Sequence, residues 1–188
     1  SIERVTKGIQ ITLRGNLFQS MKANVNKNYI PIIQDISKII ENCKLFKIEE
    51  TEKYSALVDF LEERNEELNV EIRCEGHTDD AILPPQSDFR NNWELSSARS
   101  LRVVNIMNNA SSISEKYFSY NGYGEFRPLI NVTGIDDFQK KKQARAYNRR
   151  VEIYLDAFAR PKTRSSEDEF LKMLDNKFNK KEELQPKN

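Results

Sequence analysis

The spacing of apolar residues predicts strands and helices that follow one another along most of the chain. Residues 8–18 alternate apolar with polar side chains, which is the period of a half-buried strand. Residues 70–76 alternate in the same way and place Cys74 on the inward side. Residues 117–123, which end among glycines, and residues 151–155 predict two further strands.

Three other segments have the period of a helix, with one apolar stripe and one polar face. They are residues 29–43, 51–65 and 93–107. Pro31 falls in the first turn of the first helix, where proline is tolerated. Asn92 is the expected N-cap of the third helix, because asparagine accepts hydrogen bonds from the first helical N–H groups.

The order of these elements predicts an α/β (α+β) two-layer sandwich, with a mixed β-sheet and helices packed on one of its faces. We expect residues 1–7 to form an N-terminal linker and residues 8–157 a single domain. Within that domain, the polar, lysine-rich segment 134–147 suits a surface excursion. Residues 158–188 are expected to be a C-terminal tail, with a capping box and a short amphipathic helix near 166–178.

Composition narrows the classes of function. Lys and Arg number 30 and Asp and Glu 29, so the net charge of +1 gives no field that would attract nucleic acid. Cys43, Cys74 and the lone His77 supply neither a disulfide framework nor a closed metal-ligand set, so we expect no metal and no cofactor. No apolar run approaches the ~20 residues that span a bilayer. The chain begins at Ser1, and we expect its targeting element upstream.

An acid and a base are expected to face a common space at the edge of the sheet. Asp79 follows the end of a predicted strand, while Asn92, Ser96 and Arg99 share one face of the third helix. A carboxylate and a guanidinium together suit a zwitterionic ligand, because one binds an ammonium and the other a carboxylate. The alternative is that Asp79 and Arg99 form a salt bridge, or that Asp79 caps a turn.

Four ordered blocks carry a resemblance to a known family. They are Thr78-Asp79, residues 92–100 (NWELSSARS), residues 122–128 (GYGEFRP) and residues 148–152 (NRRVE). This order resembles the signature of OmpA-like domains: TD, then N-x-x-L-S-x-x-R, then G-Y-G-E-x-x-P, then N-R-R-V-E. Residues 76–80 (GHTDD) together with NWELS are most similar to the MotB-like branch, the flagellar stator proteins.

The resemblance implies a non-catalytic domain that binds the diamino acid of the peptidoglycan stem peptide. It further implies a periplasmic location, a homodimer, a MotA-like partner, and a parent protein anchored in the inner membrane by an N-terminal helix that lies outside this sequence. The binding residues implied by family position or by helical offset are Thr78, Asp79, Asn92, Leu95, Ser96, Arg99, Arg149 and Arg150.

Two other interpretations are compatible with parts of the sequence. An OmpA-like domain of an outer-membrane protein or lipoprotein would tether that membrane to the cell wall with the same fold. A catalytic Cys74–His77 pair is disfavoured, because their positions on the predicted strand direct the two side chains to opposite sides.

Overall fold

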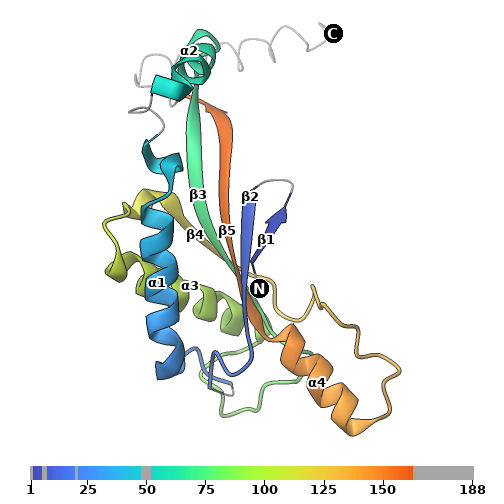
Figure 1. Cartoon of the computed structure of the whole chain (residues 1–188). Helices are drawn as coiled ribbons and strands as arrows, with labels where there is room; N and C mark the ends of the chain where they lie inside the picture. The colour runs from blue at the N-terminus through green and yellow to red at the C-terminus, as the bar shows by residue number, and fades with distance from the viewer. Residues whose placement is uncertain (1, 6–7, 20, 48–51, 163–188) are drawn as a thin grey trace, which may run out of the picture.

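The computed structural model describes residues 2–5, 8–19, 21–47 and 52–162, and a five-stranded sheet forms its centre (Figure 1). The strand order is β1-β2-β5-β3-β4, in which β3 and β4 are parallel and the other neighbours antiparallel. The strands are β1 (Ile2–Val5), β2 (Gly8–Arg14), β3 (Glu66–His77), β4 (Phe118–Gly122) and β5 (Arg150–Pro161).

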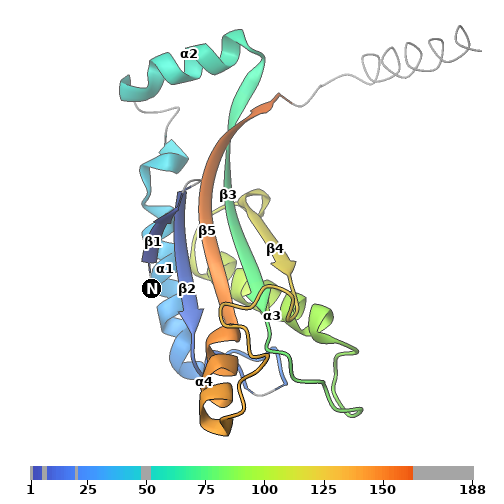
Figure 2. The same ribbon diagram turned by 90° about the vertical axis from the view of Figure 1, so that its right-hand side faces the viewer.

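Helices cover one face of this sheet and both of its ends. Figures 1 and 2 show α1 and α3 side by side on one face, α2 beyond the start of β3, and α4 beyond the start of β5. Among the described residues, no helix combines the length and apolar character needed to cross a membrane. The α-helices are α1 (Ile30–Glu41), α2 (Ser55–Glu63), α3 (Asn92–Ala110) and α4 (Phe138–Asn148), with 3-10 turns at Lys27–Tyr29, Lys44–Lys47, Glu52–Tyr54 and Glu115–Tyr117.

The core lies between the sheet and the helices α1 and α3. Ile72 and Cys74 of β3 and Ile153 of β5 are completely or almost completely buried on that side, against Ile33 of α1 and Met107 of α3. Alternate residues of the same strands point to the opposite face, which is polar. The sequence prediction of a two-layer fold with helices on one face of a mixed sheet is therefore confirmed.

Close packing of α3 against two strand ends places the beginning of this helix beside the loop that follows β3. A Cβ atom on Gly76 would lie 2.1 Å from the carbonyl oxygen of Ser96, and one on Gly122 would lie 2.2 Å from Oγ of Ser97. Only glycine permits this approach of backbone to helix. Thr78 and Asp79 consequently leave the sheet next to the first turn of α3.

Several local expectations need correction. Residues 2–5, which were expected within a linker, form the edge strand β1. The segment 134–147 lies at the surface as expected but contains most of α4, whose N-cap Asp137 accepts a hydrogen bond from the N–H of Lys140. Asn91, not Asn92, caps α3: its backbone is extended and its side chain accepts from the N–H of Glu94.

The sheet extends beyond residue 157, where the predicted domain ends. β5 continues to Pro161 and pairs with the start of β3, so residues 158–161 belong to the sheet. The helix expected near 166–178 lies outside the described residues.

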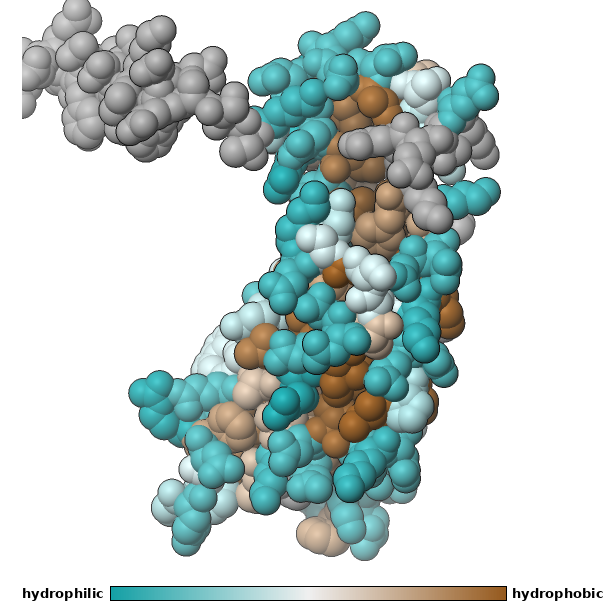
Figure 3. All heavy atoms as spheres, turned by 90° about the vertical axis from the view of Figure 1, so that its left-hand side faces the viewer, coloured by the Kyte–Doolittle hydropathy of each residue, from teal (hydrophilic) through white to brown (hydrophobic). Residues whose placement is uncertain are grey.

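Apolar side chains also gather on the outer surface of α1 and α2. Figure 3 shows this face of the molecule as a brown band that runs along its length between polar borders. Ile32 and Ile39 of α1 and Leu57 and Phe60 of α2 are its exposed large apolar residues. An apolar surface of this kind is typical of a protein contact.

Candidate functional site

A pocket of about 260 Å³ opens where the loop after β3 meets the beginning of α3. It is bordered on the remaining sides by the segment after β2 and by α4. Six of the eight predicted binding residues line it. The lining residues are Gly15, Asn16, Phe18, Met21, Thr78, Asp79, Ala81, Leu83, Asn92, Leu95, Arg99, Lys142 and Arg149.

The Asp79 carboxylate is held by a turn and by one arginine. Its Oδ1 accepts a hydrogen bond of 3.1 Å from the N–H of Ala81, and its Oδ2 accepts one of 2.5 Å from Arg149. The amide of Asn92 donates to the carbonyl oxygens of Asp79 and Ala81 at 3.4 and 3.1 Å. Asn92 therefore shapes the turn that presents Asp79, while only 9% of the Asp79 surface is exposed.

Arg99 is buried beneath the segment that follows β2, with 3% of its surface exposed. Its Nε donates to the carbonyl of Lys22 at 3.0 Å and a terminal nitrogen donates to that of Gln19 at 3.4 Å, while the guanidinium lies 4.9 Å from the Phe18 ring centre. Burial lowers the pKa of Arg99 to about 10, although the nearby Asp79 opposes that shift. No carboxylate of the described chain forms an ion pair with it. Of the alternative interpretation, the Asp79–Arg99 salt bridge is therefore wrong, whereas the capping of a turn by Asp79 is seen at Ala81.

Thr78 and Leu95 complete the interior of the pocket. The backbone N–H of Thr78 donates to the carbonyl of Gly124, but its buried hydroxyl has no hydrogen-bond partner within the described residues. A buried polar atom without a partner costs free energy unless a ligand or water satisfies it. Leu95 is buried and gives the pocket an apolar wall.

Two predicted residues lie elsewhere. Oγ of Ser96 accepts from the N–H of Gly124 and donates to the carbonyl of Trp93, so Ser96 fixes the contact between α3 and the loop after β4. Arg150 points to the polar face of the sheet, where it pairs with Glu152 at 2.6 Å. Neither residue is among those that line the pocket, so the structure does not bring them together with the other six predicted residues.

Helix α4 is tied to the turn at Asp79 and Asp80 by two ion pairs. Arg149, the residue after α4, binds Asp79, and Arg145 binds both carboxylate oxygens of Asp80 at 2.7 and 3.0 Å. The hydrogen bond from Arg145 lowers the pKa of Asp80. Lys142 lies one turn earlier and lines the pocket. The sequence did not predict Lys142 as a pocket residue, because its position depends on how α4 packs against the turn. The helix itself could have been predicted, since Asp137 is a good N-cap and a lysine-rich run follows it.

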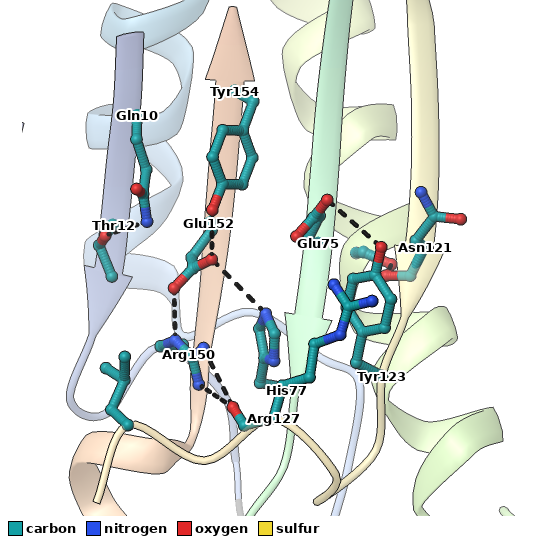
Figure 4. A network of polar contacts seen from close by, with 12 residues as sticks. Gln10, Thr12, Glu75, His77, Asn121, Tyr123, Arg127, Arg150, Glu152 and Tyr154 are labelled. Atoms are coloured by element: carbon teal, nitrogen blue, oxygen red, sulfur yellow. Dashed lines mark hydrogen bonds and ion pairs between the residues drawn. The ribbon is translucent and has the colours of Figure 1, made fainter. Parts of the chain in front are cut away.

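The polar face of the sheet carries a second cluster of ionisable groups, which Figure 4 shows from close by. Nε2 of the buried His77 lies 3.7 Å from Oε2 of Glu152, too far for a good hydrogen bond. Ligand atoms of Glu75, His77 and Glu152 lie within 4.8 Å of one another, which is a spacing that could hold a metal ion. Each carboxylate is already paired with an arginine, however: Glu75 with Arg73 at 2.8 Å and Glu152 with Arg150.

Both candidate carboxylates of this cluster are therefore already engaged by arginines, and Arg73 also pairs with Glu71 and Asp156. Burial alone would raise the pKa of Glu152, but contacts with His77, Arg150 and Tyr154 lower it to about 2. A cation placed among these groups would have to compete with two arginines for the same carboxylates. The Arg127 guanidinium adds a further positive charge, 3.6 Å from the centre of the Tyr123 ring that stacks on His77.

Comparison with known proteins assigns the chain to a family. The model of the OmpA family matches residues 46–142, which is more than half of the chain, and the chain therefore belongs to the OmpA family. It is 26% identical over 151 residues to Motility protein B of Bacillus subtilis (strain 168), covering 80% of this chain. The match takes in 46% of that relative, so the chain spans about half of its length.

Solved structures share the fold. The periplasmic domain of Helicobacter pylori MotB is 23% identical with a TM-score of 0.57, and the match covers 95% of this chain and 91% of that one. The cell wall anchor of the type VI secretion system (T6SS) of Pseudomonas aeruginosa is 22% identical with a TM-score of 0.57, over 84% and 87% of the two chains. The predicted OmpA-like fold and the predicted likeness to MotB are confirmed.

Proposed function

We propose that this domain binds the stem peptide of peptidoglycan without cutting it, and that it anchors a flagellar motor stator to the cell wall. The observation that carries this proposal is a pocket in which a buried carboxylate, Asp79, and a buried guanidinium, Arg99, are present but not paired with each other. Charges held apart in this way suit a ligand with both an ammonium and a carboxylate.

The pocket offers a contact for each part of a diamino acid side chain. Asp79 takes the ammonium, while Arg149 and Arg99 attract the carboxylate, and the Thr78 hydroxyl gains the partner that it lacks. Leu95 is positioned for the methylene groups between the two charges. A diamino acid with an amine and a carboxyl group at the same end fits this arrangement better than lysine does, because lysine has no carboxylate to offer.

The binding is proposed to be non-catalytic. Cys74 lies in the core on one face of β3, whereas His77 lies on the other face. Burial also raises the pKa of the Cys74 thiol to about 12, which disfavours the reactive thiolate. The proposed site thus consists of groups that hold a ligand, and its nucleophile candidate is directed elsewhere.

The stator assignment follows from the similarity to Motility protein B and to MotB periplasmic domains. On this proposal the domain lies in the periplasm, its parent protein carries an N-terminal inner-membrane helix, and a MotA-like subunit pairs with that helix. A tether that joins the outer membrane to the wall is the second candidate, because the same fold also occurs in a protein other than MotB, the P. aeruginosa cell wall anchor, and one fold can serve several functions. The upstream sequence distinguishes them: a membrane helix with a charged residue favours the stator, and a lipobox or β-barrel favours the tether.

A homodimer is proposed as the working state, with the apolar surface of α1 and α2 as its contact. Exposed isoleucines at 32 and 39 would be covered by a second copy. Substitution Ile39→Glu should shift the domain toward monomer in sedimentation analysis, while the exposed substitution Lys38→Glu, on the same helix, serves as the charge control. A wild-type domain that stays monomeric at high concentration would contradict this contact.

Sedimentation with insoluble peptidoglycan is the direct test of the function. The wild-type domain should co-sediment with purified cell wall and be released by a soluble stem tripeptide that contains the diamino acid. Absence of co-sedimentation by a folded domain would refute the proposal.

A further inference from the structure

We infer that the pocket recognises a stem peptide by a second carboxylate beside the diamino acid, and that Lys142 is the residue that distinguishes this carboxylate from its amide. The inference rests on the proposed function and specifies its ligand. It begins from the charges that line the pocket: one carboxylate, that of Asp79, faces three cations, Arg99, Lys142 and Arg149.

The cations on the pocket side of α4 are spaced for one helical face. Lys142, Arg145 and Arg149 follow one another at intervals of three and four residues. Two of them are neutralised, Arg149 by Asp79 and Arg145 by Asp80. Within the described part of the chain, Lys142 has no acidic partner, and it lines the pocket nonetheless.

The pocket lining carries one negative and three positive side chains, and a zwitterionic ligand, which has no net charge, would not change this excess of positive charge. Such a group brings one ammonium and one carboxylate, so the excess from Arg99 and Lys142 would persist after binding. A ligand with a further carboxylate reduces it. In a stem peptide, the residue before the diamino acid carries a carboxyl group, which occurs as the free acid or as the carboxamide.

The position of Lys142 suits a selective role. Its side chain is exposed, so it can reach a ligand group at the mouth of the pocket, whereas Arg99 is fixed by backbone carbonyls. A lysine acts as a point charge on a flexible stem and demands little of the geometry of its partner. It would therefore contribute discrimination between acid and amide, while Asp79 contributes most of the affinity.

The test compares two ligands and three proteins by calorimetry at low salt. The ligands are a synthetic stem tripeptide with the free acid before the diamino acid and the same tripeptide with the carboxamide there. Wild-type protein should bind the acid about two- to fivefold more tightly, as expected for a partly exposed ion pair. Lys142→Gln should reduce this preference to near one, through a loss of affinity for the acid that is larger than its loss for the amide.

Lys140→Gln is the matched control, because Lys140 is an exposed lysine of α4 that does not line the pocket. It should retain the wild-type preference. Equal affinity of the wild type for both ligands would overturn the inference and leave the proposed function intact. If Lys140→Gln reduces the preference for the acid as much as Lys142→Gln does, the inference about Lys142 is overturned, and the preference arises from the total positive charge of α4. If neither ligand binds and the domain does not sediment with cell wall, the inference and the proposed function both fail.

Discussion

The polar face around His77 and the pocket around Asp79 adjoin each other at the end of β3, yet they differ in charge balance. On the polar face, Glu75 and Glu152 are each paired with an arginine. In the pocket, Asp79 has one arginine partner, while Arg99 and Lys142 form no ion pair with a carboxylate of the described residues. Carboxylates that already have arginine partners stabilise the fold without a ligand, whereas cations without an ion-pair partner have charge left to bind with. The predictions below separate these two roles.

The largest effect is expected for Asp79→Asn. The variant keeps the shape of the side chain but loses the charge that binds the ligand ammonium, so affinity for the stem tripeptide should fall by about 2 to 5 kcal/mol. Thermal unfolding should change little, because the lost Asp79–Arg149 pair is partly exposed on the arginine side. Calorimetry and cell-wall sedimentation measure the first effect and scanning calorimetry the second. Unfolding of the variant with unchanged affinity of the remaining folded protein would instead make Asp79 a structural residue.

The next largest effect, on stability alone, is expected for Glu152→Gln. It leaves Arg150 buried without its carboxylate, which typically costs about 3 kcal/mol of unfolding free energy. Glu67→Gln is the matched control: Glu67 pairs with Arg160 across the same two strands, but both side chains are well exposed, so a loss below about 1 kcal/mol is expected. Urea titration measures both, and the folded Glu152→Gln protein should bind peptidoglycan normally. Reduced binding by that folded protein would contradict the separation, because the polar face would then contribute to ligand binding.

Acid should weaken the polar network through Glu152. The pKa of this group is lowered from 4.5 to about 2, so the folded state holds it ionised more strongly than the unfolded state does. Its contribution is present in full above pH ~4.5 and is lost as the pH falls toward 2. Unfolding free energies measured from pH 6 to pH 2 should therefore fall less steeply for Glu152→Gln than for the wild type. Parallel curves for the two proteins would contradict this assignment.

The sequence predicted the parts of the site that depend on local periodicity. Asp79 at a strand exit and Asn92 and Arg99 on one face of α3 follow from periods of two and of about 3.6 residues, although Ser96, predicted from the same helical period, does not line the pocket. The same alternation would have excluded Arg150, because Val151 next to it points into the core.

Other parts of the pocket could not be predicted in this way. Phe18, Met21 and Lys142 reach it through the docking of two segments that are far from β3 in sequence, and no local pattern encodes that docking. The burial of Arg99 was also missed, because its partners are backbone carbonyls of Gln19 and Lys22, which have no side-chain signature. Arg99 lines the pocket as expected, but only 3% of its surface is exposed.

The smallest effect is expected for Arg99→Lys. Because Arg99 is buried and bonded to backbone carbonyls, the exchange is expected to act through those hydrogen bonds. A lysine keeps the positive charge but cannot donate to the carbonyls of Lys22 and Gln19 with the fork of a guanidinium. We expect the segment after β2 to be held less firmly, with a loss of about 1 kcal/mol in stability and an intermediate affinity for the stem tripeptide. Arg102→Lys, an exposed exchange on the same helix, should change neither quantity. Arg99→Ala should cost more stability than Arg99→Lys, since it removes every donor to the two carbonyls, leaves a cavity and loses the contact with Phe18. If Arg99→Lys matches the wild type in urea titration and calorimetry, Arg99 acts only through its charge, and the segment after β2 is held by other contacts.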